Sequence, residues 1–320
     1  MTLKVQGRVL SIGFAKTTYW RALTLDLDTF IVTTFCLLDD MLTDFNKHHR
    51  LRQRGPAPTL ADSEVLTVEL VGELLGLAQD RAIFHYFRRH FAHFFPRLRR
   101  VDRTTFVRQA ANLWKVKEAL WQRLLAHTYA DPQFALLDSF PVPVCRFARA
   151  PRCKGFRGQA SFGKDHSAKA YFYGFRLHVR VAWPGVITRL AVVPANVSDQ
   201  ALIEPLMEQT TGYTLADRNY WNPELMARLR GCGNGLIAPF RKRSSDPQPE
   251  RAGWINHFRF RIETVFSQLT ERFHIKRVWA RDEWHLASRI LRKVLAHTIA
   301  VVINREVGNR PLRLAEALTL

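Results

Sequence analysis

The segment Phe134-Ala135-Leu136-Leu137-Asp138 gives the clearest indication of the fold class. Its apolar run is typical of a short strand buried on both faces, and an aspartate follows directly. The same order returns in Tyr213-Thr214-Leu215-Ala216-Asp217. Sites in an open α/β sheet form at the carboxyl ends of strands, so two neighbouring strands would bring Asp138 and Asp217 close together.

Other strand and helix patterns surround these two segments. Residues 171–181 alternate, Trp183-Pro184-Gly185 reads as a turn, and residues 186–193 return, which predicts a hairpin. Another short apolar run covers residues 235–238, and helical patterns cover residues 199–209, 222–230, 255–273 and 285–304. This order predicts an α/β layer with one hairpin and two parallel crossovers.

The N-terminal part reads differently from the rest of the chain. Residues 21–130 form several helical patterns separated by tight breaks, with a basic run from Arg97 to Arg103. Such a pattern predicts a helix-turn-helix-like DNA-binding region, and a plain helical bundle with solvated arginines is the alternative. We separate residues 1–20 as an atypical N-terminal extension of uncertain status and residues 306–320 as a C-terminal tail.

The charge composition narrows the choice of partner. The 320 residues include 48 Lys and Arg against 28 Asp and Glu, a net charge of +20. A field of that sign attracts polyanions, above all nucleic acid, and an anionic membrane is the main competitor. Neither a bilayer-spanning apolar stretch nor a signal peptide stands out, which predicts a cytoplasmic, nucleoid-associated protein that binds no membrane.

Three acidic residues stand where metal chemistry needs them. Asp138 and Asp217 follow apolar runs, and Glu263 lies beside the apolar stripe of the helix at residues 255–273. Carboxylate oxygens suit Mg²⁺ or Mn²⁺, and two such ions roughly 3.5–4 Å apart can clamp the attacking and leaving oxygens of a phosphoryl transfer.

Each acid also has an ordinary explanation. An aspartate after a strand often caps a turn, and Glu263 stands four residues after Arg259, the spacing of a surface ion pair. Asp199 is a rival for the second aspartate because it too follows a strand, although it reads as a helix cap.

The sequence motifs around these acids form a characteristic set. They are Leu136-Leu137-Asp138-Ser139-Phe140-Pro141-Val142, Tyr173-Gly174-Phe175-Arg176-Leu177-His178, Pro194-Ala195-Asn196-Val197-Ser198-Asp199, Leu215-Ala216-Asp217-Arg218-Asn219-Tyr220 and Arg261-Ile262-Glu263-Thr264-Val265-Phe266-Ser267-Gln268-Leu269. In this order they resemble the DDE transposases of bacterial insertion sequences, over residues 59–300. The resemblance departs at Asn219, where many relatives have glycine, and at Asn256 and Thr270, where relatives often have tyrosine and lysine.

The resemblance implies a fold and a metal site. Residues 131–305 would form a ribonuclease H-like catalytic domain, a five-stranded mixed sheet with flanking helices, preceded by the all-helical N-terminal region. Asp138, Asp217 and Glu263 would be the catalytic residues and the ligands of two Mg²⁺ (or Mn²⁺) ions.

A cationic loop follows Asp138. Its basic residues interleave with glycines and phenylalanines, which predicts a clamp on the DNA backbone, and a merely solvated loop is the alternative. The residues are Arg146, Arg149, Arg152, Lys154, Arg157, Lys164 and Lys169. On the glutamate helix, Arg259, Arg261 and Arg272 are further expected DNA contacts.

These observations predict a transposase that cuts DNA at the ends of an insertion sequence and transfers the freed 3′-hydroxyls. Its partners would be double-stranded DNA, namely the terminal inverted repeats and the target, and it would act on DNA as a homodimer because two ends are joined. The alternatives are a catalytically silent DNA-binding protein derived from a transposase and a ribonuclease H-like repair nuclease.

Overall fold

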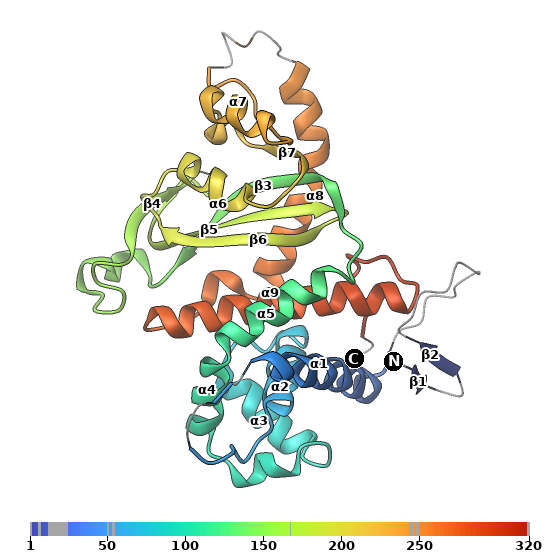
Figure 1. The fold of residues 1–320 in the computed structure, drawn as a ribbon. Helices are drawn as coiled ribbons and strands as arrows, with labels where there is room; N and C mark the ends of the chain where they lie inside the picture. The colour runs from blue at the N-terminus through green and yellow to red at the C-terminus, as the bar shows by residue number, and fades with distance from the viewer. Residues whose placement is uncertain are drawn as a thin grey trace. The chain divides into compact units, whose positions relative to one another are not determined.

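The computed structural model describes residues 2–5, 8–11, 25–49, 51–52, 55–166, 168–242, 246 and 250–318. The chain divides into two compact units, which we name the helical unit (Met1–Thr128 with Ala287–Leu320) and the sheet unit (Tyr129–Leu286) (Figure 1). This division differs from the predicted one. Most of the final helix and residues 306–320 group with the helical unit, whereas the sequence placed residues up to 305 in the catalytic domain.

Helices make up the described part of the helical unit, apart from a short N-terminal hairpin. They are α1 (Leu27–His48), α2 (Asp62–Leu74), α3 (Asp80–His90), the 3-10 helix η1 (Pro96–Arg100), α4 (Arg103–Asn112), α5 (Trp114–Leu125) and α9 (Glu283–Glu306). Local signals set their starts: Asp26 accepts from the Thr29 amide at 2.9 Å, and Glu64 accepts from the Ala61 amide at 2.7 Å.

The C-terminal helix joins this unit through buried charges. On α9, Arg292 Nε lies 2.7 Å from Glu73 Oε1, and Lys293 Nζ lies 2.7 Å from Glu73 Oε2. These side chains are almost fully buried, and a buried charge without an opposite charge beside it would be strongly destabilising. The ion pairs with Glu73 therefore explain why α9 groups with α2. The predicted tail also packs inward, since Leu314, Ala317 and Leu318 are buried.

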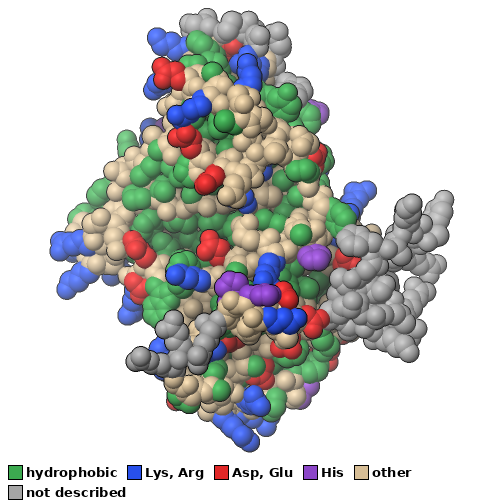
Figure 2. Space-filling model, viewed as in Figure 1, with side chains coloured by type: hydrophobic (Ala, Val, Ile, Leu, Met, Phe, Trp, Pro, Cys, Tyr) green, Lys and Arg blue, Asp and Glu red, His purple; other side chains and the backbone are tan. Residues whose placement is uncertain are grey.

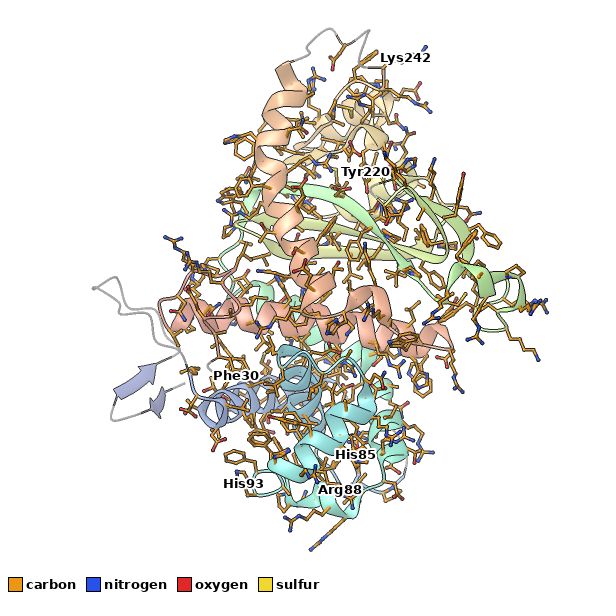
Figure 3. The ribbon with its side chains drawn as sticks, turned by 180° about the vertical axis from the view of Figure 1, so that it is seen from behind. Phe30, His85, Arg88, His93, Tyr220 and Lys242 are labelled. Carbon is orange, nitrogen blue, oxygen red and sulfur yellow. The ribbon has the colours of Figure 1, made fainter. Side chains whose placement is uncertain are left out.

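The N-terminal extension and the basic run are the remaining predicted features of the helical unit. In the N-terminal extension, β1 (Thr2–Val5) and β2 (Arg8–Ser11) pair antiparallel, and its other residues lie outside the described ones. The basic run from Arg97 to Arg103 has its arginines exposed. Figure 3 shows His85, Arg88 and His93 at the surface around α3. The DNA-binding role of this surface stays a prediction.

The sheet unit contains a mixed six-stranded sheet. Its strands are β3 (Asp131–Pro143), β4 (Ser161–Asp165), β5 (Ala170–Trp183), β6 (Val186–Pro194), β7 (Gly212–Ala216) and β8 (Asn234–Ile237). The order is β4-β5-β3-β7-β8, and β6 also pairs with β5. The β5–β6 hairpin is antiparallel and the β3–β7 and β7–β8 pairs are parallel, as the sequence pattern predicted.

The strand count corrects the expected five. The additional strand is β4, which lies within the cationic loop and pairs antiparallel with residues 170–174 of β5. Its alternating burial was hidden in the sequence by Gly163 and Lys164, because glycine and lysine are depleted in strands. The rest of the sheet is compatible with a ribonuclease H-like transposase fold.

Helices cover both faces of this sheet (Figures 1 and 3). One face packs on α8 (Glu250–Glu271), where the rings of Phe140 and Phe266 lie 4.7 Å apart. The other face packs on α6 (Ile203–Met207) and α7 (Pro223–Gly231), with Leu137 in their hydrophobic cluster. Among the described residues, no helix combines the length and apolarity needed to cross a bilayer.

The position of Asp138 also differs from the expectation. It lies inside β3 rather than after it, because β3 continues to Pro143 as the partner of β5. Its parallel pairing with β7 nevertheless stops at Leu137, opposite Ala216. Pro141 and Pro143 fall in the part beyond, where β7 no longer pairs with the strand, and proline is tolerated at such an edge.

Candidate active site

Strand register brings Asp138 and Asp217 to one face of the sheet. Leu136 pairs with Leu215, and each aspartate stands two residues further along its own strand direction. Side chains alternate along a strand, so both carboxylates share the face of Leu136 and Leu215, which α8 covers. The convergence follows from a parallel pairing in register, which the two apolar runs alone could not specify.

Arg259 of α8 bridges the two carboxylates. Its Nη2 atom lies 3.0 Å from Asp138 Oδ2, and its Nη1 atom lies 3.4 Å from Asp217 Oδ1. Because a guanidinium is planar and short, the two aspartates must lie close together to share it. The apolar stripe of α8 sets this position, since Ile255 and Ile262 on either side of Arg259 are buried.

Backbone amides also donate to both carboxylates. The Ser139 amide donates to Asp138 Oδ1 at 2.8 Å, and the Arg218 amide donates to Asp217 Oδ1 at 2.6 Å. Burial raises the pKa of Asp138 to about 6, against the lowering effects of Arg259 and of the Ser139 amide, and the charges of Asp217 and Asp199 raise it further. Burial therefore disfavours the ionised form of Asp138 more than Arg259 and the Ser139 amide favour it.

Glu263 lies one helical turn after Arg259 on the same helix. Its side chain is exposed rather than drawn into the Arg259 contact. Within the described ranges, no three or more His, Cys, Asp and Glu side chains approach closely enough to hold a metal ion. The structure thus brings two of the three predicted acids together and leaves the third one turn away along α8.

The donor set fits a hard divalent cation. Asp138 and Asp217 offer carboxylate oxygens from two strands to one positive group, and such oxygens suit Mg²⁺ or Mn²⁺. Burial is the main cause of the raised pKa of Asp138, with a smaller contribution from the neighbouring acids, and a bound cation would favour the ionised form instead. The His85, His90 and His93 side chains are all exposed and belong to no such group among the described residues.

Asp199, the rival second aspartate, lies on the opposite side of β3. Its Oδ1 atom accepts from Ser139 Oγ at 3.4 Å and lies 3.7 Å from His178 Nε2. Ser139 alternates with Asp138, so this contact uses the face that α6 and α7 cover. Burial raises the pKa of Asp199, although Arg176 opposes the shift. Asp199 therefore belongs to a second polar cluster.

Sequence reasoning gave His178 and Tyr220, two further members of this second cluster, no role. His178 Nδ1 lies 2.9 Å from the hydroxyl of Tyr220, which is labelled in Figure 3. Burial and Arg176 lower the pKa of His178 to about 4, so its ring is neutral at pH 7. Burial, Asp199 and Asp138 raise the pKa of Tyr220, so its hydroxyl keeps its proton. The alternation of Arg176 and His178 in the quoted motif was the available signal, because it places both on one face.

The predicted DNA contacts fall into two groups. The seven basic residues of the loop after Asp138 are all exposed, and Figure 2 shows Lys and Arg side chains at the projecting end of this loop. The three arginines of α8 and its end are only partly exposed. Arg259 binds the aspartates, Arg261 lies 4.7 Å over the ring of Trp183, and burial lowers the pKa of Arg272. Their contact with DNA stays a prediction.

Comparison with known proteins gives one family. Residues 130–282 match the family model described as the transposase DDE domain. The matched segment contains Asp138, Asp217, Glu263 and the strands that position the aspartates. No curated protein and no solved structure matches the chain. The match confirms the resemblance carried by the sequence motifs: residues 130–282 are similar to the transposase DDE domain, which supports a DDE-type transposase.

Proposed function

We propose that this protein is a transposase that cuts DNA strands at the ends of an insertion sequence and transfers the freed 3′-hydroxyls to target DNA. The observation that carries the proposal is the convergence of Asp138 and Asp217 on Arg259, at the point where β3 and β7 stop pairing. Paired carboxylates from two adjacent strands, in a chain of net charge +20, suit metal-assisted chemistry on a polyanion.

Asp138 and Asp217 would hold two Mg²⁺ or Mn²⁺ ions, with Glu263 as the third ligand. When bound, the ions supply positive charge to the attacking and leaving oxygens of the phosphodiester. The amides of Ser139 and Arg218 keep the aspartates oriented. Arg259 keeps the two aspartates together in the absence of metal. Glu263 stands one turn after Arg259 on α8 and would approach the metal site from the same side of that helix.

The rest of the chain would supply the DNA contacts. The exposed cations of the loop after Asp138 hold the DNA backbone, and the helical unit recognises the terminal inverted repeats through its basic surface. Arg259, Arg261 and Arg272 add contacts from α8 when DNA is bound. Two copies act together as a homodimer, because two ends must be joined, and the protein works at the nucleoid, where its DNA lies.

The test is strand cleavage of end-containing duplex DNA with Mg²⁺ or Mn²⁺. We expect Asp138→Ala, Asp217→Ala and Glu263→Ala each to lower the cleavage rate by at least about 100-fold, the scale of a lost metal-site group. Glu271→Ala is the matched control, since Glu271 is an exposed acid two turns further along α8. Cleavage that persists in one of the three variants would remove that residue from the site.

The same assay separates the alternatives. A catalytically silent DNA-binding protein would bind DNA in a salt-sensitive manner and cut nothing with either metal. A ribonuclease H-like repair nuclease would prefer junction DNA to element ends in direct competition.

A further inference from the structure

Three aromatic side chains lie exposed together in the sheet unit. Phe147, Phe162 and Tyr171 are 50%, 54% and 61% exposed. The ring of Phe147 lies 6.1 Å from that of Phe162 and 6.3 Å from that of Tyr171. We name these three residues the aromatic patch. Large apolar side chains grouped on a surface usually mark an interaction site.

The backbone holds the aromatic patch in place. Phe162 on β4 pairs with Tyr173 on β5, and Lys164 pairs with Tyr171, so these four side chains share one face of the strand pair. The Phe162 and Tyr173 rings lie 5.0 Å apart, and Lys164 Nζ lies 5.8 Å from the centre of the Tyr171 ring. Tyr173 is itself buried and donates to the Phe156 carbonyl at 3.3 Å.

Positive charge surrounds the aromatic patch. All seven basic residues predicted for this loop, from Arg146 to Lys169, are exposed. Between residues 146 and 171 the sequence has one acid, Asp165, and Lys276 lies 3.9 Å from it. A binding partner with an apolar protein surface would offer these cations no negative charge. A nucleic acid strand offers both phosphates for the cations and flat apolar faces for the rings.

We infer that the aromatic patch binds the unpaired bases of a single DNA strand. In a duplex, the base faces are stacked inside and only edges and phosphates remain outside, so exposed rings would meet no flat partner. In a single strand, bases stack on aromatic side chains while a basic groove follows the backbone. The inference rests on the proposed function, in which the loop lies on DNA that is being cut, and it adds a site for the frayed strand.

The experiment measures binding of an oligo(dT) strand and of a duplex of equal length by fluorescence anisotropy, with EDTA and no metal. We expect Phe147→Ala and Tyr171→Ala each to weaken oligo(dT) binding by about 5- to 100-fold, the scale of one lost base stack, and duplex binding by less than about twofold. Phe147→Trp and Tyr171→Trp should restore it. A 2-aminopurine placed in the strand should be quenched by the wild-type protein and by the Trp variants only.

Two controls keep the outcome decisive. Tyr213→Ala removes an equally exposed aromatic residue (59%) from β7, outside the aromatic patch, and should leave both affinities unchanged. Phe147→Leu and Tyr171→Leu keep apolar volume while removing the ring, so they serve if an alanine variant does not fold. Arg149→Ala should weaken both DNA forms and lower the salt slope by about one.

Equal losses on single strand and duplex, or unchanged oligo(dT) binding in folded Phe147 and Tyr171 variants, would overturn the inference. Failure of the proposed function looks different. In that case no DNA is cut with Mg²⁺ or Mn²⁺, while Phe147→Ala and Tyr171→Ala still weaken metal-free binding of oligo(dT) more than that of the duplex.

Discussion

The guanidinium of Arg259 lies 3.0 Å from the carboxylate of Asp138, and the two residues come from adjacent layers of the sheet unit, the helix α8 and the sheet. The same guanidinium reaches Asp217 at 3.4 Å. The positive charge that holds the two carboxylates together is therefore supplied by the chain itself. A divalent cation that bound both aspartates would compete with Arg259 for the same oxygens.

This competition makes the first prediction. Without a metal, Arg259→Gln should lower the free energy of unfolding by about 1–2 kcal/mol, since two half-buried carboxylates lose their counter-charge. Saturating Mn²⁺ should then raise the melting temperature of the variant more than that of the wild type. Differential scanning calorimetry with and without Mn²⁺ measures both effects.

Arg261→Gln is the control for this prediction. Arg261 lies on the same helix and stacks over Trp183 and Phe260, away from the aspartates. It should change stability without changing the response to Mn²⁺. An identical Mn²⁺ shift in the wild type and in Arg259→Gln would mean that Arg259 and the metal do not compete.

The raised pKa of Asp138 gives a pH-dependent prediction. Its pKa is about 6 in the folded protein against 3.8 for the free side chain, so folding favours the protonated form. The stabilisation from the protonated form is complete below pH 3.8 and is lost as the pH rises through 6. In EDTA, Asp138→Asn should therefore gain stability relative to the wild type between pH 4 and pH 7.

The gain follows from the size of the shift. A pKa shift of about two units corresponds to about 3 kcal/mol. The difference in the free energy of unfolding between Asp138→Asn and the wild type should therefore change by up to that amount between pH 4 and pH 7. Urea unfolding at four or five pH values measures it. A difference between variant and wild type that is independent of pH would contradict the assigned pKa.

A buried lysine in the helical unit gives the third prediction. Lys117 is fully buried, and its Nζ atom lies 2.6 Å from Glu69 Oε2 and 2.9 Å from both the Ala110 carbonyl and Ser288 Oγ. Lys117→Met removes one charge of the network and should cost about 3–5 kcal/mol of unfolding free energy.

The double variant Lys117→Met with Glu69→Gln should recover part of this loss, and a thermal melt of both proteins measures the recovery. If the double variant were less stable than Lys117→Met alone, the pairing would not explain the loss.

The start of β7 gives the fourth prediction. Gly212 has φ of +78°, and a Cβ there would lie 2.4 Å from the Gln133 backbone. Gly158 has a similar φ of +81° and open space around the same position. Gly158→Ala should cost about 1–2 kcal/mol for the left-handed backbone alone. Gly212→Ala should cost at least about 2 kcal/mol more, because the clash with backbone forces β7 away from β3.

Chemical unfolding of the two glycine variants tests this difference. Since Asp217 directly follows β7, Gly212→Ala should also weaken Mn²⁺ binding, whereas Gly158→Ala should not. Equal stability losses in the two variants would show that the approach of Gly212 to Gln133 is not tight in solution.

Much of the fold was predictable from local pattern. The β5–β6 hairpin, the strand at β7 and the apolar stripe of α8 appear where hydrophobic periodicity placed them, within a few residues at each end. The order of these elements also predicted the parallel pairing of β7. Periodicity works here because each of these segments buries one defined set of side chains.

Other features depended on partners that periodicity cannot identify. β3 runs on to Pro143 because β5 pairs with it, and β4 forms because residues 170–174 of β5 offer it an edge. The grouping of α9 with α2 depends on Arg292 and Lys293 meeting Glu73. In the sequence, these residues look like ordinary surface charges.

Local pattern was enough to identify the candidate functional residues: two aspartates after apolar runs, a glutamate on a patterned helix and a cluster of cations. That Asp138 and Asp217 share Arg259, and that Asp199 faces His178 on the other side of β3, became visible in the folded chain alone. The reason is geometric. Residue type and local periodicity are properties of neighbours along the chain, whereas a shared ion pair depends on strand register, which long-range packing sets.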